Sequence, residues 1–111
     1  MSNSLKAHKM LARHEKLAVD EARREKHLPV AYALRDPSQV SAIVAEAAVQ
    51  VGLWRSGHLC SIDYIEAWEG LLKQPVEAAN VLESRSLKSI QLRQNSPFVA
   101  AVRRFKVDHA A

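Results

Sequence analysis

The sequence is poor in the residues that cross-link, break or loosen a chain. It contains one cysteine, three glycines, four prolines, and two each of tryptophan, tyrosine and phenylalanine in 111 residues. The single cysteine, Cys60, excludes an internal disulfide and, with it, a disulfide-stapled secreted fold. The scarcity of glycine and the abundance of alanine favour helix along the whole chain.

Long hydrophobic runs are also absent. Residues 1–16 have no apolar stretch of the length that a signal peptide requires. The longest nearly uncharged run, residues 36–55, contains Glu46 and is too polar and too short for a membrane span. A hydrophobic content of 48% and a charged content of 25% are ordinary for a single globular domain with a modest core. We therefore predict a cytoplasmic protein that does not enter a membrane.

Charge is distributed unevenly along the chain. Residues 1–36 hold eight Lys/Arg and five Asp/Glu, a net of +3; residues 37–80 hold two and five, a net of −3; residues 81–111 hold six and two, a net of +4. This layout has two explanations. It is either a set of ordinary solvated helix faces, or a pair of cationic ends that bind phosphate or an acidic protein partner.

The N-terminal segment, residues 4–27, is predicted to be a long basic helix. It lacks glycine and proline, and its apolar residues are too few to bury much of its surface. We expect it to end at His27, because proline at position 29 disfavours helix in the residue before it. The predicted organisation is a surface or partner-docking helix over residues 1–27 and a helical domain over residues 28–111, beginning with a connector at 30–37.

The segment 38–55 is apolar nearly all round, which is typical of a helix in the middle of a bundle. Asp36 and Pro37 are suited to its N-cap and first position. The fold class that we predict is all-α, a single compact domain of five to six helices around this central helix. Four further helices are predicted over 61–73, 75–84, 84–96 and 97–107, with Ser61 and Ser96 as caps. Their expected inward side chains include Ile62, Ile65, Trp68, Leu72, Val76, Leu82, Leu87, Ile90 and Phe98.

Residues 51–72 invite comparison with a DNA-reading helix-turn-helix. Such a motif needs a tight turn and a second helix that approaches phosphate. Here the gap, taken as residues 55–61, is too long, and the second helix carries the carboxylates of Asp63, Glu66 and Glu69. Because these carboxylates oppose phosphate binding, we predict a helical corner that only builds the core. Trp54 is expected in that core, with a partner anchor as the alternative.

Residues with catalytic or metal-binding chemistry are sparse. His58 and Cys60 are close in sequence, but residues two apart rarely orient each other as base and nucleophile. The five histidines match no zinc spacing. Glu66 and Glu69 lack the Glu-x-x-His partner of a bundle metal site. We expect no enzyme activity, no metal and no cofactor.

Two functional hypotheses remain. Size and composition are similar to those of small helical accessory proteins of bacteria and their mobile elements. The first hypothesis is therefore a non-catalytic protein that occupies a macromolecular partner, as an antitoxin or an inhibitor of a nucleic-acid enzyme or defence system does. The alternative is a small regulator that binds nucleic acid through its basic ends. The oligomeric state is left open. The predicted contact residues are Lys6, Lys9, Arg13, Lys16, Arg23, Arg24, Arg103, Arg104 and Lys106.

Overall fold

The described residues fold into six helices and contain no strand. The computed structural model describes the backbone of residues 2–110 and the side chains of residues 9–106. This confirms the predicted all-α single domain. The helices are α1 (Ser2–Leu34), α2 (Val40–Gly57), α3 (Ile62–Leu72), α4 (Pro75–Glu83), α5 (Leu87–Arg93) and α6 (Val99–Ala110).

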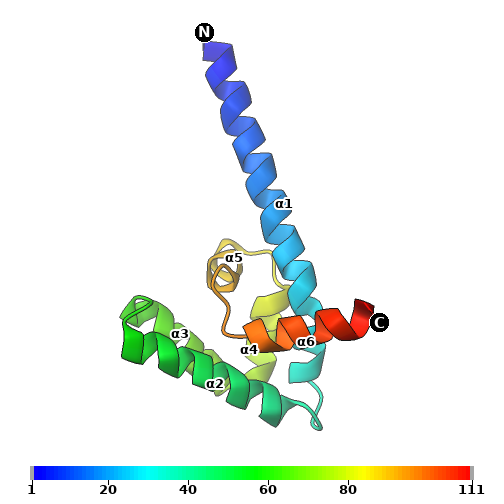
Figure 1. Ribbon diagram of the computed structural model, residues 1–111. Coiled ribbons are helices and arrows are strands. Elements are labelled where there is room, and N and C mark those ends of the chain that lie inside the picture. Colours follow the sequence, from blue (N-terminus) through cyan, green and yellow to red (C-terminus); the bar gives the residue numbers. More distant parts are fainter. Residues whose placement is uncertain (1, 111) are drawn as a thin grey trace.

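Helix α1 has two different environments along its length. Its N-terminal half projects well beyond the other helices, and its C-terminal part lies among them (Figure 1). That C-terminal part contains Val30, Ala31 and Leu34, which are buried, and α1 contacts α2, α4, α5 and α6. The projection gives the molecule extents of 56 × 36 × 22 Å. The helix that touches most of the others is therefore α1, rather than the segment 38–55 that the sequence favoured.

The helix end predicted at His27 is wrong, because α1 continues through Pro29 to Leu34. A proline inside a helix removes one hydrogen bond and crowds the preceding turn, at a cost of about 3 kcal/mol. Burial of Val30 and Leu34 offsets that cost, since a fully buried aliphatic side chain contributes about 1.5–3 kcal/mol. Half of the connector predicted at 30–37 is thus part of the core: Val30, Ala31, Ala33 and Leu34 are buried.

Helix α2 packs through one face only. Ile43, Ala47, Val51 and Trp54 are buried at helical spacing, but Val49 and Leu53 on the other side are exposed. The expected burial all round this helix is therefore not observed. The predicted start is wrong, because α2 begins at Val40 with Gln39 as its N-cap, and Pro37 lies in the turn before it. The Asp36 Oδ1 accepts a hydrogen bond from the Ser38 backbone N–H at 2.9 Å and shapes that turn.

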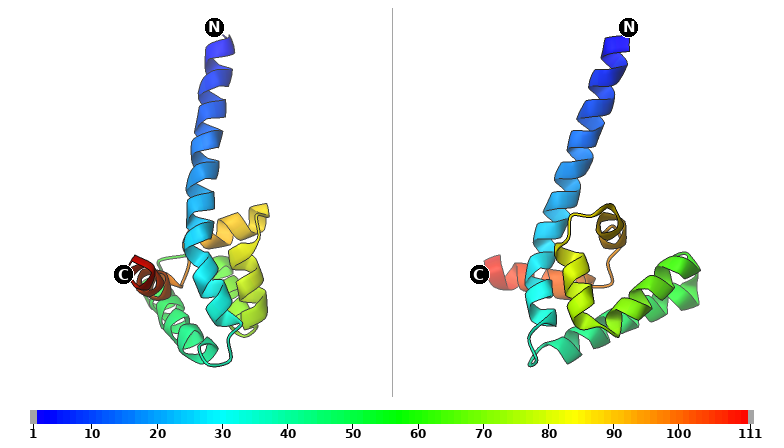
Figure 2. Two further views of the ribbon diagram at one scale, coloured as in Figure 1. Left: turned by 90° about the vertical axis from the view of Figure 1, so that its right-hand side faces the viewer. Right: turned by 180° about the vertical axis from the view of Figure 1, so that it is seen from behind.

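Helices α2 and α3 form an antiparallel hairpin, which the views in Figures 1 and 2 agree in showing. His58 adopts a left-handed conformation (φ 52°) after Gly57, and the Ser61 Oγ caps α3 by accepting from the Tyr64 N–H at 3.2 Å. The turn is shorter than the gap expected from sequence, because α2 runs on to Gly57. The antiparallel packing nevertheless differs from the roughly 90–120° crossing of a helix-turn-helix.

The remaining helices complete a core centred on two aromatic side chains. Trp68 is fully buried and meets Phe98 edge to face, with ring centroids 5.6 Å apart. Three residues predicted to point inward are instead exposed: Ile62, Val76 and Leu87. Each lies in the first turn of its helix, where the chain is still at the periphery of the domain.

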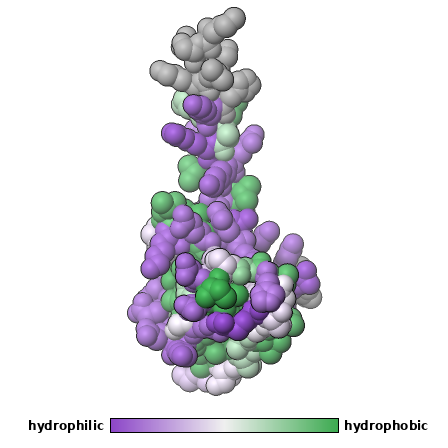
Figure 3. Space-filling model, turned by 90° about the vertical axis from the view of Figure 1, so that its left-hand side faces the viewer, coloured by the Kyte–Doolittle hydropathy of each residue, from purple (hydrophilic) through white to green (hydrophobic). Residues whose placement is uncertain are grey.

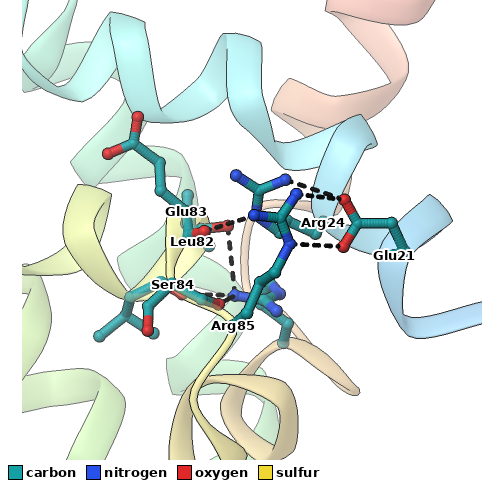
Figure 4. A network of polar contacts seen from close by, with 8 residues as sticks. Glu21, Arg24, Leu82, Glu83, Ser84 and Arg85 are labelled. Carbon is teal, nitrogen blue, oxygen red and sulfur yellow. Dashed lines mark hydrogen bonds and ion pairs between the residues drawn. The ribbon is translucent and has the colours of Figure 1, made fainter. Parts of the chain in front are cut away.

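A polar network fixes the direction in which α1 leaves the domain (Figure 4). The Glu21 carboxylate accepts from Arg85 at 2.9 and 3.1 Å and from Arg24 at 3.0 Å. The Arg24 Nε also donates to the backbone carbonyl of Glu83 at the end of α4. The middle of α1 is therefore tied to the segment between α4 and α5, and residues before it extend away.

Candidate partner-binding surface

The projecting part of α1 carries an exposed cationic face. Lys9, Arg13 and Lys16 follow one another at spacings of four and three residues, which places them on one side of the helix. All three side chains are exposed. The side chain of Lys6 lies outside the described residues.

This cationic face borders a groove between α1 and α5. The groove has a volume of about 480 Å³. Leu17 of α1 is 58% exposed and Leu87 of α5 is 71% exposed, and both line it with the half-buried Ile90. Two helices thus present aliphatic side chains to one hollow that no described residue fills. The lining is made by Arg13, Lys16, Leu17, Asp20, Leu87, Ile90, Gln91 and Gln94.

The groove offers positive charge to anything that enters it. Arg13 and Lys16 contribute two cations, whereas the α5 side contributes only the uncharged amides of Gln91 and Gln94. The one carboxylate in the lining, Asp20, is buried and bound to Arg23 at 3.1 Å. Its charge is therefore already balanced, and the groove as a whole favours an acidic ligand.

Hydrophobic side chains also mark this part of α1. Figure 3 shows hydrophobic and hydrophilic residues interleaved along the projecting helix. Met10, Leu11, Leu17 and Val19 are each more than half exposed. Of these four side chains, Leu17 alone lines the groove, where it lies with the exposed Leu87.

The remaining predicted contact residues have different environments in the structure. Arg24 is used internally, as described above, and Arg23 is paired with Asp20. Arg104 of α6 pairs with Glu46 of α2 at 2.9 Å. Arg103 and Lys106 are exposed on α6. The nine residues therefore do not form a single surface.

Two residues that the sequence analysis did not select lie close to Arg23 and Arg103. His27 and Arg93 are buried, and together with these two arginines they line a cavity of about 210 Å³. No local pattern indicates this grouping, because the four residues come from α1, α5 and α6. Only the packing of these helices brings them together.

The residues considered for catalysis are placed as follows. The Cys60 Sγ is half-buried and accepts from the Asn95 Nδ2 at 3.2 Å, and His58 is exposed in the turn before it. Within the described part of the chain, no three His, Cys, Asp or Glu residues are grouped so that they could hold a metal ion. None of the described helices is both long and apolar enough to cross a membrane.

The fold and this surface define a six-helix all-α domain with a projecting N-terminal helix. No known family, curated protein or solved structure matches the chain.

Proposed function

We propose that the chain is a non-catalytic binding module whose α1–α5 groove takes an acidic amphipathic helix of a partner protein. In this proposal it acts by occupying the partner in the cytoplasm, as an antitoxin or an inhibitor of a nucleic-acid enzyme or defence system does. The observation that supports it is the joint presence of Leu17, Leu87 and Ile90 beside Arg13 and Lys16 in one open groove. Such a groove matches a helix with apolar residues on one side and carboxylates beside them.

A protein partner fits this groove better than nucleic acid does. Phosphate contacts need cations but not aliphatic side chains, and affinity for nucleic acid comes largely from those cations. Here Leu17 and Leu87 are exposed within the same hollow as Arg13. Covering them removes apolar surface from water, which stabilises a complex by roughly 25 cal/mol per Å² before the costs of association.

The test uses two substitutions on the same exposed helix. Leu17→Glu places a carboxylate in the groove, whereas Leu11→Glu places one on another side of α1, about 120° around the helix from Leu17. Leu11 does not line the groove. Both leucines are more than half exposed, so neither change should disturb folding. The full-length chain and each variant are used to capture proteins from the native host, and captured proteins are then titrated individually. We expect one stoichiometric partner that binds the parent chain and Leu11→Glu alike, and binds Leu17→Glu at least tenfold more weakly, about 1.4 kcal/mol.

The binding segment of that partner should be helical and acidic. Recovery of no stoichiometric protein, or equal binding of both variants, would overturn the proposal. Nucleic acid is the competing occupant. A titration with duplex DNA and single-stranded RNA at about 50 and 200 mM salt separates it, because counterion release makes such binding fall steeply with salt. Binding of nucleic acid that falls steeply between the two salt concentrations would favour the alternative, a small nucleic-acid-binding regulator.

A further inference from the structure

The cavity lined by Arg23, His27, Arg93 and Arg103 is rich in positive charge, and the described residues that line it include no carboxylate. It lies where α1 meets α6 and the end of α5, and Ser96 also lines it. Its volume of about 210 Å³ corresponds to roughly seven water molecules at 30 Å³ each. This is room for one small tetrahedral ion with some water.

Arg93 is a buried cation without an acidic partner. It is 2% exposed, and its Nη1 donates to the backbone carbonyls of Val81 at 2.7 Å and of Leu82 and Ser84. These bonds close the C-terminal end of α4, but carbonyl dipoles do not balance a full charge. Among the described residues, no carboxylate forms an ion pair with Arg93 or with Arg103. Burial lowers the pKa of Arg93, yet an arginine stays protonated in proteins.

His27 has one nitrogen engaged and one without a partner. Its Nδ1–H donates to the Arg23 backbone carbonyl at 2.7 Å, since a carbonyl only accepts. Its Nε2 is the one buried side-chain nitrogen or oxygen among the described residues that has no hydrogen-bond partner. Burial, and then the charge of Arg93, hold the pKa of His27 below its usual range. The ring is therefore neutral near pH 7, and Nε2 presents a lone pair that accepts a hydrogen bond.

The charges that face His27 are predominantly positive. Helix α1 contributes Arg23 and Lys26 as cations and Asp20 as the carboxylate paired with Arg23. Helix α5 contributes Arg93, and α6 contributes Arg103, which lines the same cavity. Asp20 is paired with Arg23, and the charges of Asp20 and Glu21 also act favourably on Arg93 without bonding to it. Among the described residues, the guanidinium groups of Arg93 and Arg103 therefore face the cavity without a carboxylate bonded to them. These two charges match a dianion.

The chemistry of the cavity selects among anions. Two guanidinium groups that bond to no carboxylate favour a small oxyanion, because charged hydrogen bonds from arginine to such oxygens are strong and often paired. The lone pair of His27 Nε2 favours, in addition, a ligand atom that donates a hydrogen bond. Sulfate, an ionised carboxylate and a fully ionised phosphomonoester have no such donor. Hydrogenphosphate has negative oxygens and one P–OH group.

We propose that this cavity binds hydrogenphosphate, with its anionic oxygens facing Arg93 and Arg103 and its P–OH group donating to His27 Nε2. This inference goes beyond the proposed partner-binding function, because the groove residues Leu17 and Leu87 do not line the cavity. Bound phosphate gives the buried His27 Nε2 its partner and neutralises Arg93. It should therefore stabilise the folded chain in proportion to its concentration above the dissociation constant.

The first test compares three anions by calorimetric titration of the full-length chain at pH about 8 and constant ionic strength. His27 is neutral there, as is any histidine of ordinary or lowered pKa. We expect inorganic phosphate to bind at least tenfold more tightly than sulfate, and also more tightly than phenyl phosphate, which lacks a P–OH group at this pH. Equal affinities for the three anions, or no binding of phosphate, would overturn the proposal.

The second test uses matched substitutions on α6. Arg103 lines the cavity and Lys106 does not, and both are exposed, so neither Arg103→Gln nor Lys106→Gln should affect folding. We expect Arg103→Gln to weaken phosphate binding at least fivefold and Lys106→Gln less than twofold. Nitrogen NMR of the imidazole supplies an independent readout: phosphate should shift the His27 Nε2 resonance and leave that of exposed His14 in place. Equal effects of the two substitutions, or an unmoved His27 resonance, would contradict the assignment.

Discussion

Trp54 joins the hairpin of α2 and α3 through its ring. It is 3% exposed and lies 5.9 Å from the Tyr64 ring, measured between centroids. Trp54→Ala should lower the free energy of unfolding by about 3–5 kcal/mol, because truncation of a buried aromatic leaves a cavity. The measurement is urea denaturation followed by the fluorescence of Trp68. Leu53→Ala, one residue earlier and more than half exposed, is the control and should change stability by less than about 0.5 kcal/mol. A loss as small as that of the control would place Trp54 outside the core.

His27 makes the stability of the domain depend on pH. Its folded-state pKa lies below the ordinary value, chiefly because of burial. The unfolded chain therefore binds more protons in the window below pH about 6.5, and stability falls as pH decreases through that window. Above this value the contribution is constant. In phosphate-free buffer, His27→Gln should flatten the decline in denaturation midpoint between pH about 7 and 5. His14→Gln, at an exposed position, should not. A decline that persists in His27→Gln would assign it to other groups.

Individual side chains were predictable from sequence where their environment is local. The cap Ser61 is confirmed, since Tyr64 donates its backbone N–H to it. Ser96 accepts from the Phe98 N–H, but it lies in the turn before α6, which begins at Val99 rather than at Pro97. The sequence did not indicate that Arg93 is buried, because a carbonyl to which it donates belongs to Val81, twelve residues earlier on another helix. Leu87 was assigned to the core by its spacing, yet it is exposed, because periodicity does not show where a short helix enters the domain.

Pro29 makes α1 less stable than alanine at the same position would. Alanine at this position restores an N–H donor and relieves crowding in the preceding turn, worth about 3 kcal/mol. The gain is reduced by up to about 1 kcal/mol, because the unfolded chain loses the stiffness of proline. Pro29→Ala should therefore raise the free energy of unfolding by about 2 kcal/mol in urea denaturation. The control is Pro37→Ala, in an exposed turn, which should not stabilise. A destabilised Pro29→Ala chain would show that packing of the half-buried proline ring outweighs the lost hydrogen bond.

The number and order of helices were predictable, but the extent of the first was not. Residue propensity and caps act within a few positions, and they located α2 to α6 to within a few residues. The end of α1 depends on burial of Val30 and Leu34 by helices much later in the chain. A local rule for Pro29 therefore failed. For the same reason, the groove between α1 and α5 could not be foreseen, although the cationic spacing of Lys9, Arg13 and Lys16 was visible.

The molecule as a whole consists of a globular body and a projecting segment of α1. The boundary between these two parts is not at residue 27, where the sequence analysis placed it. Asp20 and His27 are buried, and Glu21 and Arg24 bind the segment between α4 and α5. The part of α1 that the globular body does not hold therefore ends near residue 18. Loss of residues 20–27 removes these contacts together with the buried side chains of Asp20 and His27.

Two truncations test this boundary. A chain without residues 2–18 should keep its melting temperature within about 2 °C and retain phosphate binding, because Arg23, His27, Arg93 and Arg103 remain. It should lose partner binding, since Arg13, Lys16 and Leu17 are gone from the groove. A chain without residues 2–27 should melt more than about 10 °C lower, because a loss of a few kcal/mol shifts a domain of this size by that amount. Equal melting temperatures for the two truncated chains would mean that the contacts of Glu21, Arg24 and His27 contribute no stability. A collapse of the shorter truncation would instead show that the projecting helix supports the core.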